Sequence, residues 1–191
     1  DYSLIQEIKV LGILHAILPE ETSGSISTLP IAWRIPDAAP EQLATAARQL
    51  IEMADDLARL EEETGRLITL CIEPEPGCIL QCAADIISFF EHYLSGGEHA
   101  ERCRRYLRVC HDICHAAVMF EDQRAVLEQY SQHGIQVGKV QVSSAIEIDL
   151  DRADEGQRGE LLKGLTPFAE GRYLHQTTVR KDPHTPLRFF D

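Results

Sequence analysis

Two glutamates, Glu73 and Glu75, follow an apolar run in the sequence, and each one directly precedes a proline. Each proline fixes its own φ and restrains the residue before it, so both carboxylates stand on stiff backbone. A carboxylate held at the carboxyl end of a strand suits a hard cation or a general base. The alternative is a pair of solvated residues in a rigid turn. Because two such glutamates follow a fully apolar run, we expect both to be catalytic, and Glu73 also to bind a metal.

A second polar group, His-Asp-Ile-Cys-His over residues 111–115, ends another β-like run. Asp112 and His115 are three positions apart, so they converge if the chain turns into a loop or helix after Asp112. A carboxylate with an imidazole suits a Zn, Mn, Fe or Mg-like site. We expect Asp112 and His115 to be metal ligands and rank Cys114 below them, because a buried thiol is the commoner outcome. His111 is expected to be a hydrogen-bonded histidine behind the ligands or a contact to the substrate.

Three further residues are candidates for binding a ligand. Gln141 and Lys139 share one face of an alternating run, where Gln141 could ligate weakly through its amide oxygen and Lys139 could bind a phosphate or a carboxylate. A half-exposed strand explains Lys139 nearly as well. His175 lies near several basic residues that could meet an anionic group of a substrate, although solvated charges after a strand explain this patch equally well.

The elements that must position these residues alternate between short β-like runs and amphipathic helices. Gly65 and Gly134 each follow a helical pattern and precede a β-like run, as helix ends require. This alternation is typical of a parallel α/β architecture, and the polar residues cluster after the strands, where barrels carry their active sites. We therefore predict one α/β domain over residues 1–191, a (β/α) barrel that lacks strands at both ends. The predicted strands are 25–32, 67–73, 107–112, 137–143 and 173–179, and the predicted helices are 4–18, 40–63, 80–94, 117–133 and 155–168.

The amino-acid composition limits the kinds of ligand that the protein can bind and the cellular compartment in which we expect it. The 31 acidic and 18 basic residues give a formal net charge of −13, which disfavours an extended nucleic acid but leaves a small phosphate or a divalent cation open. No apolar run approaches the roughly 18 to 20 residues of a membrane span. The six cysteines form no Cys-x-x-Cys pair, which favours reduced thiols. We expect a cytoplasmic protein that binds a small-molecule metabolite.

Several motifs together resemble the EboE-type metabolite-traffic proteins, which are similar to the xylose-isomerase-like TIM barrels. That superfamily includes sugar isomerases, epimerases and endonuclease-type barrels. The resemblance implies an incomplete TIM (β/α) barrel of this type. It also implies a divalent metal ion (Zn, Mn or Mg) bound by Glu73, Asp112, His115 and Gln141, with Gln141 standing where such barrels usually have a histidine. The segments that carry the resemblance are 24–30, 72–78, 109–116, 120–123, 137–145 and 173–176.

Three functions are compatible with these residues. The first is a metal-dependent isomerase or epimerase of a small polyol, sugar or related metabolite, in which Glu73 or Glu75 moves a proton at carbon. The second is a non-catalytic metabolite-binding or trafficking protein that retains a repurposed metal site, which the replacement of a histidine by Gln141 favours. The third, a metal-dependent phosphodiesterase of the endonuclease type, is disfavoured by the net charge.

Overall fold

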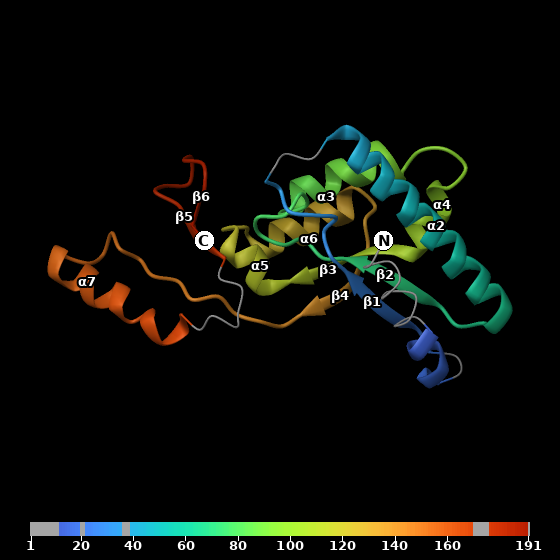
Figure 1. Ribbon diagram of the computed structural model, residues 1–191, viewed down its shortest axis with the longest axis horizontal. Helices are drawn as coiled ribbons and strands as arrows, with labels where there is room; N and C mark the ends of the chain where they lie inside the picture. The colour runs from blue at the N-terminus through green and yellow to red at the C-terminus, as the bar shows by residue number, and fades with distance from the viewer. Residues whose placement is uncertain (1–11, 20–21, 36–38, 170–175, 191) are drawn as a thin grey trace.

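Four parallel strands form the central sheet of the protein, in the order β1-β2-β3-β4 (Figure 1). The structure is a computed structural model that describes residues 12–19, 22–35, 39–169 and 176–190. Each strand pairs with the next one along the chain in parallel register. The strands are β1 (Gly24–Thr28), β2 (Ile68–Ile72), β3 (Leu107–Asp112) and β4 (Val137–Gln141).

Helices connect these strands, and Figure 1 shows α2, α3 and α6 gathered on the same side of the sheet. The long α2 begins at Pro40, where proline suits the first helical turn, and ends before Gly65, whose φ of 69° lies in the left-handed region. The predicted helix 117–133 is in fact two helices. The connecting helices are α2 (Pro40–Thr64), α3 (Ala83–Phe89), the π-helical turn η1 (Phe90–Leu94), α4 (Ala100–Tyr106), α5 (Ile113–Val118) and α6 (Gln123–Gln132).

The core lies between these helices and one face of the sheet. Every residue of β2 is buried, as expected for a strand with a neighbour on each side. Leu70 and Val109 belong to the same buried apolar cluster as Met53 and Leu57 of α2. Full burial of such a side chain stabilises the fold by about 1.5–3 kcal/mol. This packing holds the strand ends in fixed positions relative to one another.

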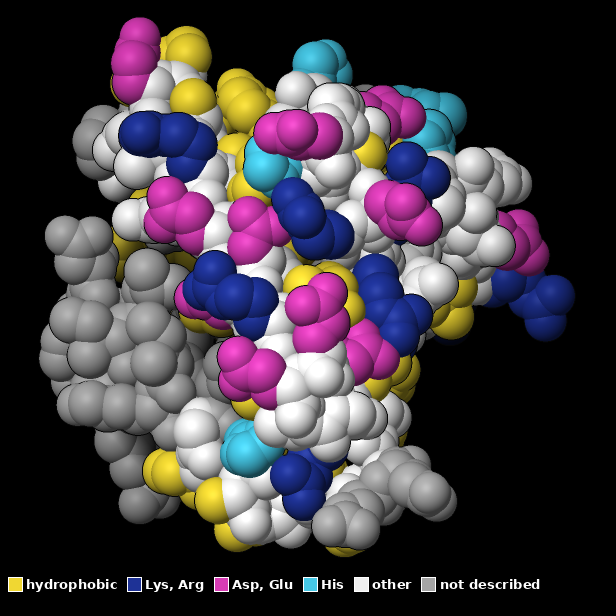
Figure 2. All heavy atoms as spheres, turned by 90° about the vertical axis from the view of Figure 1, so that its right-hand side faces the viewer, with side chains coloured by type: hydrophobic (Ala, Val, Ile, Leu, Met, Phe, Trp, Pro, Cys, Tyr) yellow, Lys and Arg dark blue, Asp and Glu magenta, His cyan; other side chains and the backbone are white. Residues whose placement is uncertain are grey.

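The surface over α2 and α4 carries charges of both signs that pair between the helices. Arg102 lies 2.7 Å from Asp55, and Arg105 forms an ion pair with Glu61. Tyr106 also donates a hydrogen bond to Glu61. Figure 2, which views the molecule from this side, shows basic and acidic side chains intermingled rather than separated. These contacts fix α4, and with it the start of β3, against α2.

The opposite face of the sheet is polar, and the sheet is strongly curled around it. The two outer strands, β1 and β4, contact each other, and Lys139 of β4 reaches Ser27 of β1, with Nζ 3.5 Å from Oγ. Gly138 occupies an irregularity in the pairing of β3 with β4. We call this side the inner face; from the pairing register it comprises Ser25, Ser27, Thr69, Cys71, Arg108, Cys110, Asp112, Lys139 and Gln141.

The predicted TIM barrel is wrong. In the part of the chain that the structure describes, the parallel sheet ends at β4, and the two later strands, β5 (Thr177–Val179) and β6 (Arg188–Phe190), pair antiparallel in a separate sheet. The described end of the predicted strand 173–179 is therefore not part of a fifth parallel strand, and residues 173–175 lie outside the described part. The alternation of strands and helices specifies parallel pairing between neighbours, but it does not specify closure.

Beyond β4 the chain leaves the body of the protein. Helix α7 (Glu155–Lys163) has no buried residue, and Figure 1 shows it away from the sheet. The short 3-10 helix η2 (Thr166–Phe168) follows it. Of the predicted helix 4–18, residues 12–17 are helical, and residues 1–11 lie outside the described part. No helix in the described ranges combines the length and the apolar character needed to cross a membrane.

Candidate metal and proton-transfer site

The carboxyl ends of β2, β3 and β4 bring together residues that are far apart in the sequence. Glu73 directly follows β2, Asp112 ends β3, and Gln141 ends β4 as the register partner of Asp112. Because neighbouring parallel strands end at the same edge of a sheet, the three side chains meet there. In open α/β sheets this edge is where ligands bind.

Asp112 is the most constrained of these residues. It is only 8% exposed, and its side chain caps helix α5 by accepting hydrogen bonds from the backbone N–H groups of Cys114 at 2.8 Å and His115 at 3.2 Å. The Ser143 hydroxyl donates to the same oxygen, Oδ1, at 2.6 Å. Burial alone would raise the pKa of Asp112, but the hydrogen bonds from Ser143 and Cys114 and the charge of His115 bring it below its usual value. Asp112 is therefore an anion at neutral pH.

His115 is oriented by the loop after β2. Its Nδ1 lies 2.9 Å from the carbonyl oxygen of Pro74 and 3.5 Å from Oε1 of Glu73. A carbonyl oxygen only accepts, so Nδ1 carries a proton and donates to it, which leaves Nε2 as the ring nitrogen that could bind a metal. Metal-binding histidines commonly donate their second N–H to a backbone carbonyl in this way. The rigid Pro74 thus supplies the orienting contact for His115.

Glu73 lies in a less polar environment than Asp112. Its side chain is 20% exposed and accepts a hydrogen bond at 2.5 Å from the amide of Gln141. Burial raises the pKa of Glu73; His115 opposes this rise, and the nearby negative charge of Asp112 adds to it. The Cys110 thiol also hydrogen-bonds to Glu73. Two neighbouring carboxylates with pKa values shifted in opposite directions are the arrangement in which one stays ionised while the other exchanges a proton.

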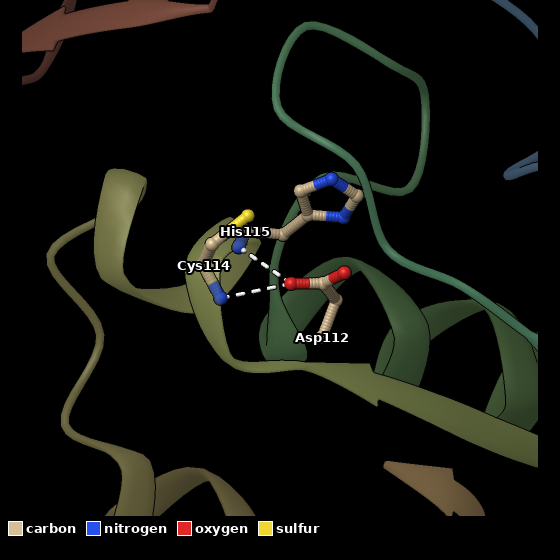
Figure 3. A group of neighbouring side chains, drawn as sticks. All are labelled: Asp112, Cys114 and His115. Atoms are coloured by element: carbon tan, nitrogen blue, oxygen red, sulfur yellow. Dashed lines mark hydrogen bonds between the residues drawn. The ribbon is translucent and has the colours of Figure 1, made fainter. Parts of the chain in front are cut away.

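Three side chains at the junction of β3 and α5 could hold a metal ion. Asp112, Cys114 and His115 each offer a ligand atom, and these atoms lie within 4.8 Å of one another. Figure 3 shows the three side chains on one turn of the chain, with Asp112 on the strand end and the other two on the first turn of the helix. An oxygen, a nitrogen and a sulfur donor together suit zinc better than magnesium. The donor set therefore fits a divalent transition metal.

Gln141 makes contacts that differ from those expected of a residue that binds a metal. Its amide nitrogen donates to Glu73 at 2.5 Å and to Oδ2 of Asp112 at 3.1 Å, so it bridges the two carboxylates. The amide group therefore presents a donor, where ligation would need its oxygen. The prediction that Gln141 binds a metal stays a prediction, and the structure assigns it a hydrogen-bonding role between the carboxylates.

The remaining predicted residues lie outside this cluster. Glu75 accepts a hydrogen bond at 2.9 Å from the amide of Gln176 rather than meeting Asp112. His111 is 5% exposed, and its Nε2 lies 2.6 Å from Oε1 of Gln123. Lys139 is on the inner face two residues before Gln141. His175 lies outside the described residues.

The structure adds two residues to the predicted site. Spacing predicts Cys114 as a weaker candidate ligand than Asp112 and His115; in the structure its thiol lies with their side chains, and the ranking stays a prediction. Ser143 is not among the residues predicted from the sequence, although it donates to Oδ1 of Asp112. A helix-capping aspartate followed by Cys and His at the second and third positions is the signal that could have identified Cys114. Ser143 follows the end of β4, and no spacing rule would have selected it.

Comparisons with known proteins assign no family to this chain. No protein-family model matches the sequence, and no curated protein sequence matches it. Among solved structures, the chain is similar to the 3-keto-D-glucoside 4-epimerase from E. coli in its apo form, with 14% sequence identity and a TM-score of 0.43 over 86% of this chain and 70% of that one. A similarity at this level carries no argument for fold or function. The resemblance to EboE-type proteins stays a prediction.

Proposed function

We propose that this protein binds a small hydroxyl- or carbonyl-bearing metabolite, such as a polyol or sugar, at the Asp112–His115 cluster and moves a proton at one of its carbon atoms. The observation that carries the proposal is that two carboxylates, Glu73 and Asp112, meet at one edge of the sheet, where both accept hydrogen bonds from the amide of Gln141. The pKa values of the two are shifted in opposite directions. They stand beside an imidazole and a thiol that suit a divalent metal.

The residues divide into two roles. Asp112, His115 and Cys114 hold a divalent cation, which when bound would polarise an oxygen of the ligand and acidify the adjacent C–H. Glu73 takes the proton from that carbon and returns it, to the same carbon in an epimerase or to the neighbouring one in an isomerase. Its raised pKa makes protonated Glu73 a more stable product of this transfer than an ordinary glutamic acid would be. Gln141 holds the Glu73 carboxylate in place between transfers.

A second function, binding without turnover, is favoured by one observation. The amide nitrogen of Gln141 donates to both carboxylates, Glu73 and Asp112, and so offsets their mutual repulsion. A protein that carries a metabolite needs an ordered polar site but no proton transfer. This candidate predicts a bound metabolite and no exchange of its C–H groups with solvent.

Elemental analysis and a solvent-exchange assay test these proposals. We expect about one equivalent of Zn or Mn after purification, or tight binding of one on titration, with loss of the metal in Asp112→Ala and His115→Ala. His133→Ala is the matched control, because His133 lies on the surface and pairs with Glu91. A wild-type protein that binds neither metal rules out the metal role.

The second arm incubates the metal-loaded protein in D₂O with a panel of four- to six-carbon aldoses and ketoses. Loss of a C–H signal in proton NMR is expected with the wild type and not with Glu73→Gln, which keeps the shape of Glu73 but cannot accept the proton. Tight retention of a sugar without exchange would support carriage in place of catalysis.

A further inference from the structure

Two cationic side chains on the inner face of the sheet lack an acidic partner among the described residues. Arg108 of β3 has a buried Nε with no hydrogen-bond partner. Lys139 of β4 makes only a long contact, 3.5 Å, to the hydroxyl of Ser27. A buried donor left unsatisfied destabilises the fold, and a charged group does so more than a neutral one. In a chain with a net charge of −13, two half-buried cations without a carboxylate need an explanation.

Hydroxyl groups surround the same place. The Cys71 thiol lies close to both cations and to the side chains of Thr69 and Ser25, all of which oppose the rise in its pKa that burial causes. Ser27 is the register partner of Cys71 on β1. Five donor-bearing side chains from all four strands therefore gather around the Cys71 position.

The backbone of β4 is shaped to let Arg108 lie there. A Cβ on Gly138 would stand 2.8 Å from Cδ of Arg108 and 2.7 Å from Sγ of Cys71. Only glycine leaves room for the Arg108 side chain beneath β4. The irregular pairing at Gly138 also places Lys139 opposite Cys110, so that both cations are on the same face.

This group of donors lies directly behind the candidate metal site. Lys139 precedes Gln141 by two residues on the same strand face, which corresponds to roughly 6.6 Å along a strand. At that site Glu73 and Asp112 each already accept a hydrogen bond, from Gln141 and from Ser143. A ligand of a few carbon atoms can therefore reach both places at once.

We propose that Arg108 and Lys139, with the hydroxyls of Ser25, Ser27 and Thr69, bind a tetrahedral oxyanion, the phosphate-type group of a small ligand. A dianion with oxygens pointing in several directions matches two cations and three hydroxyls from different strands better than a planar carboxylate does. The position of the rest of the ligand rests on the proposed function. The oxyanion site itself does not depend on the proposed function.

Titration with inorganic phosphate at constant ionic strength, followed by protein NMR or calorimetry, tests this site. We expect saturable binding to one site, at least tenfold weaker in Lys139→Met and about threefold weaker in Ser27→Ala, with acetate binding more weakly than phosphate. Lys163→Met is the matched control, since it removes one positive charge from the exposed helix α7. The phosphate affinity of this variant should equal that of the wild type. Ser27→Ala leaves all charges in place, so it remains informative if Lys139→Met fails to fold.

The outcomes separate this proposal from the metal site. A wild-type Kd weaker than about 20 mM, stronger binding of acetate, or affinities unaffected by both inner-face variants would overturn the oxyanion site. Metal titration of folded Lys139→Met should match the wild type. If phosphate binds as described and no metal binds, the oxyanion site stands and the proposed function fails. If a metal binds and phosphate does not, only the oxyanion site is ruled out.

Discussion

Replacing Asp112 by Asn and by Ala separates its structural role from its charge. The Oδ1 atom accepts from two backbone N–H groups at the start of α5 and from the Ser143 hydroxyl, whereas Oδ2 accepts from Gln141. Asparagine keeps one oxygen and loses the charge. Alanine loses both. The two variants should therefore agree in metal binding and differ in stability.

The expected changes in the free energy of unfolding and in metal affinity follow from these contacts. Asparagine caps helices about as well as aspartate, so Asp112→Asn should retain the free energy of unfolding of the wild type to within about 1 kcal/mol. Asp112→Ala loses the cap, worth about 1 kcal/mol, and a charge-assisted hydrogen bond from Ser143, worth about 1.5 kcal/mol. We therefore expect a loss of about 2–3 kcal/mol. Metal affinity should fall at least about 100-fold in both variants, because the loss of an outer-shell partner alone costs 10- to 100-fold.

Urea denaturation in the presence of EDTA measures the stability without a metal contribution, and titration with Zn or Mn measures the affinity. Equal destabilisation by Asn and Ala would show that the charge of Asp112, rather than its capping oxygen, stabilises the fold. Wild-type metal affinity in Asp112→Asn would refute the assignment of Asp112 as a ligand. Either result would contradict the separation of roles described above.

Two further predictions concern the parts of the fold that hold the site. Glu61→Gln should lower the free energy of unfolding by about 0.5–1 kcal/mol at pH 7, because the hydrogen bond from Arg105 holds the pKa of Glu61 below its usual value even though burial opposes it. This stabilisation is complete above the unfolded pKa of about 4.3 and is lost as the pH falls through the folded pKa, so denaturation curves of the two proteins should converge in acid. Gly138→Ala should cost about 1–3 kcal/mol in urea denaturation, because its Cβ would overlap neighbouring side chains. Gly159→Ala, where a Cβ meets nothing within 4 Å, should instead leave stability unchanged or raise it by up to about 1 kcal/mol.

The sequence predicts the local elements around the site better than their arrangement. Glycine after α2 and the apolar run before Glu73 place a helix end and a buried strand close to where the structure has them. These signals are local, since they depend on φ and on burial within a few residues. Closure of a sheet depends on which strand lies beside β4, and no short pattern in the sequence encodes that partner. The barrel prediction failed because the last predicted strand was assigned to the parallel sheet, whereas its described residues Thr177–Val179 pair antiparallel with β6.

In the candidate site, too, contacts within one segment can be predicted from the sequence, whereas contacts between distant segments cannot. Asp112 and His115 could be paired from their spacing because a capping aspartate and the first helical turn bring them together within one segment. The contacts of His115 with Pro74, and of Gln141 with Glu73, join segments far apart in the chain and depend on the strand register. Which end of an amide faces a partner depends on that partner, so residue spacing does not show whether Gln141 offers its oxygen or its nitrogen.

The orientation of the Gln141 amide affects how the site could bind a cation. Two carboxylates close together repel unless a cation or a donor lies between them, and here the amide nitrogen of Gln141 occupies that place. A bound cation would also stabilise both negative charges, so it and the amide nitrogen compete for the same oxygens. Binding at Asp112 through Oδ2 therefore requires the Gln141 side chain to rotate. In the proposed metal site the Gln141 side chain is then a reversible occupant, which would lower the metal affinity while keeping Glu73 and Asp112 in place for a ligand.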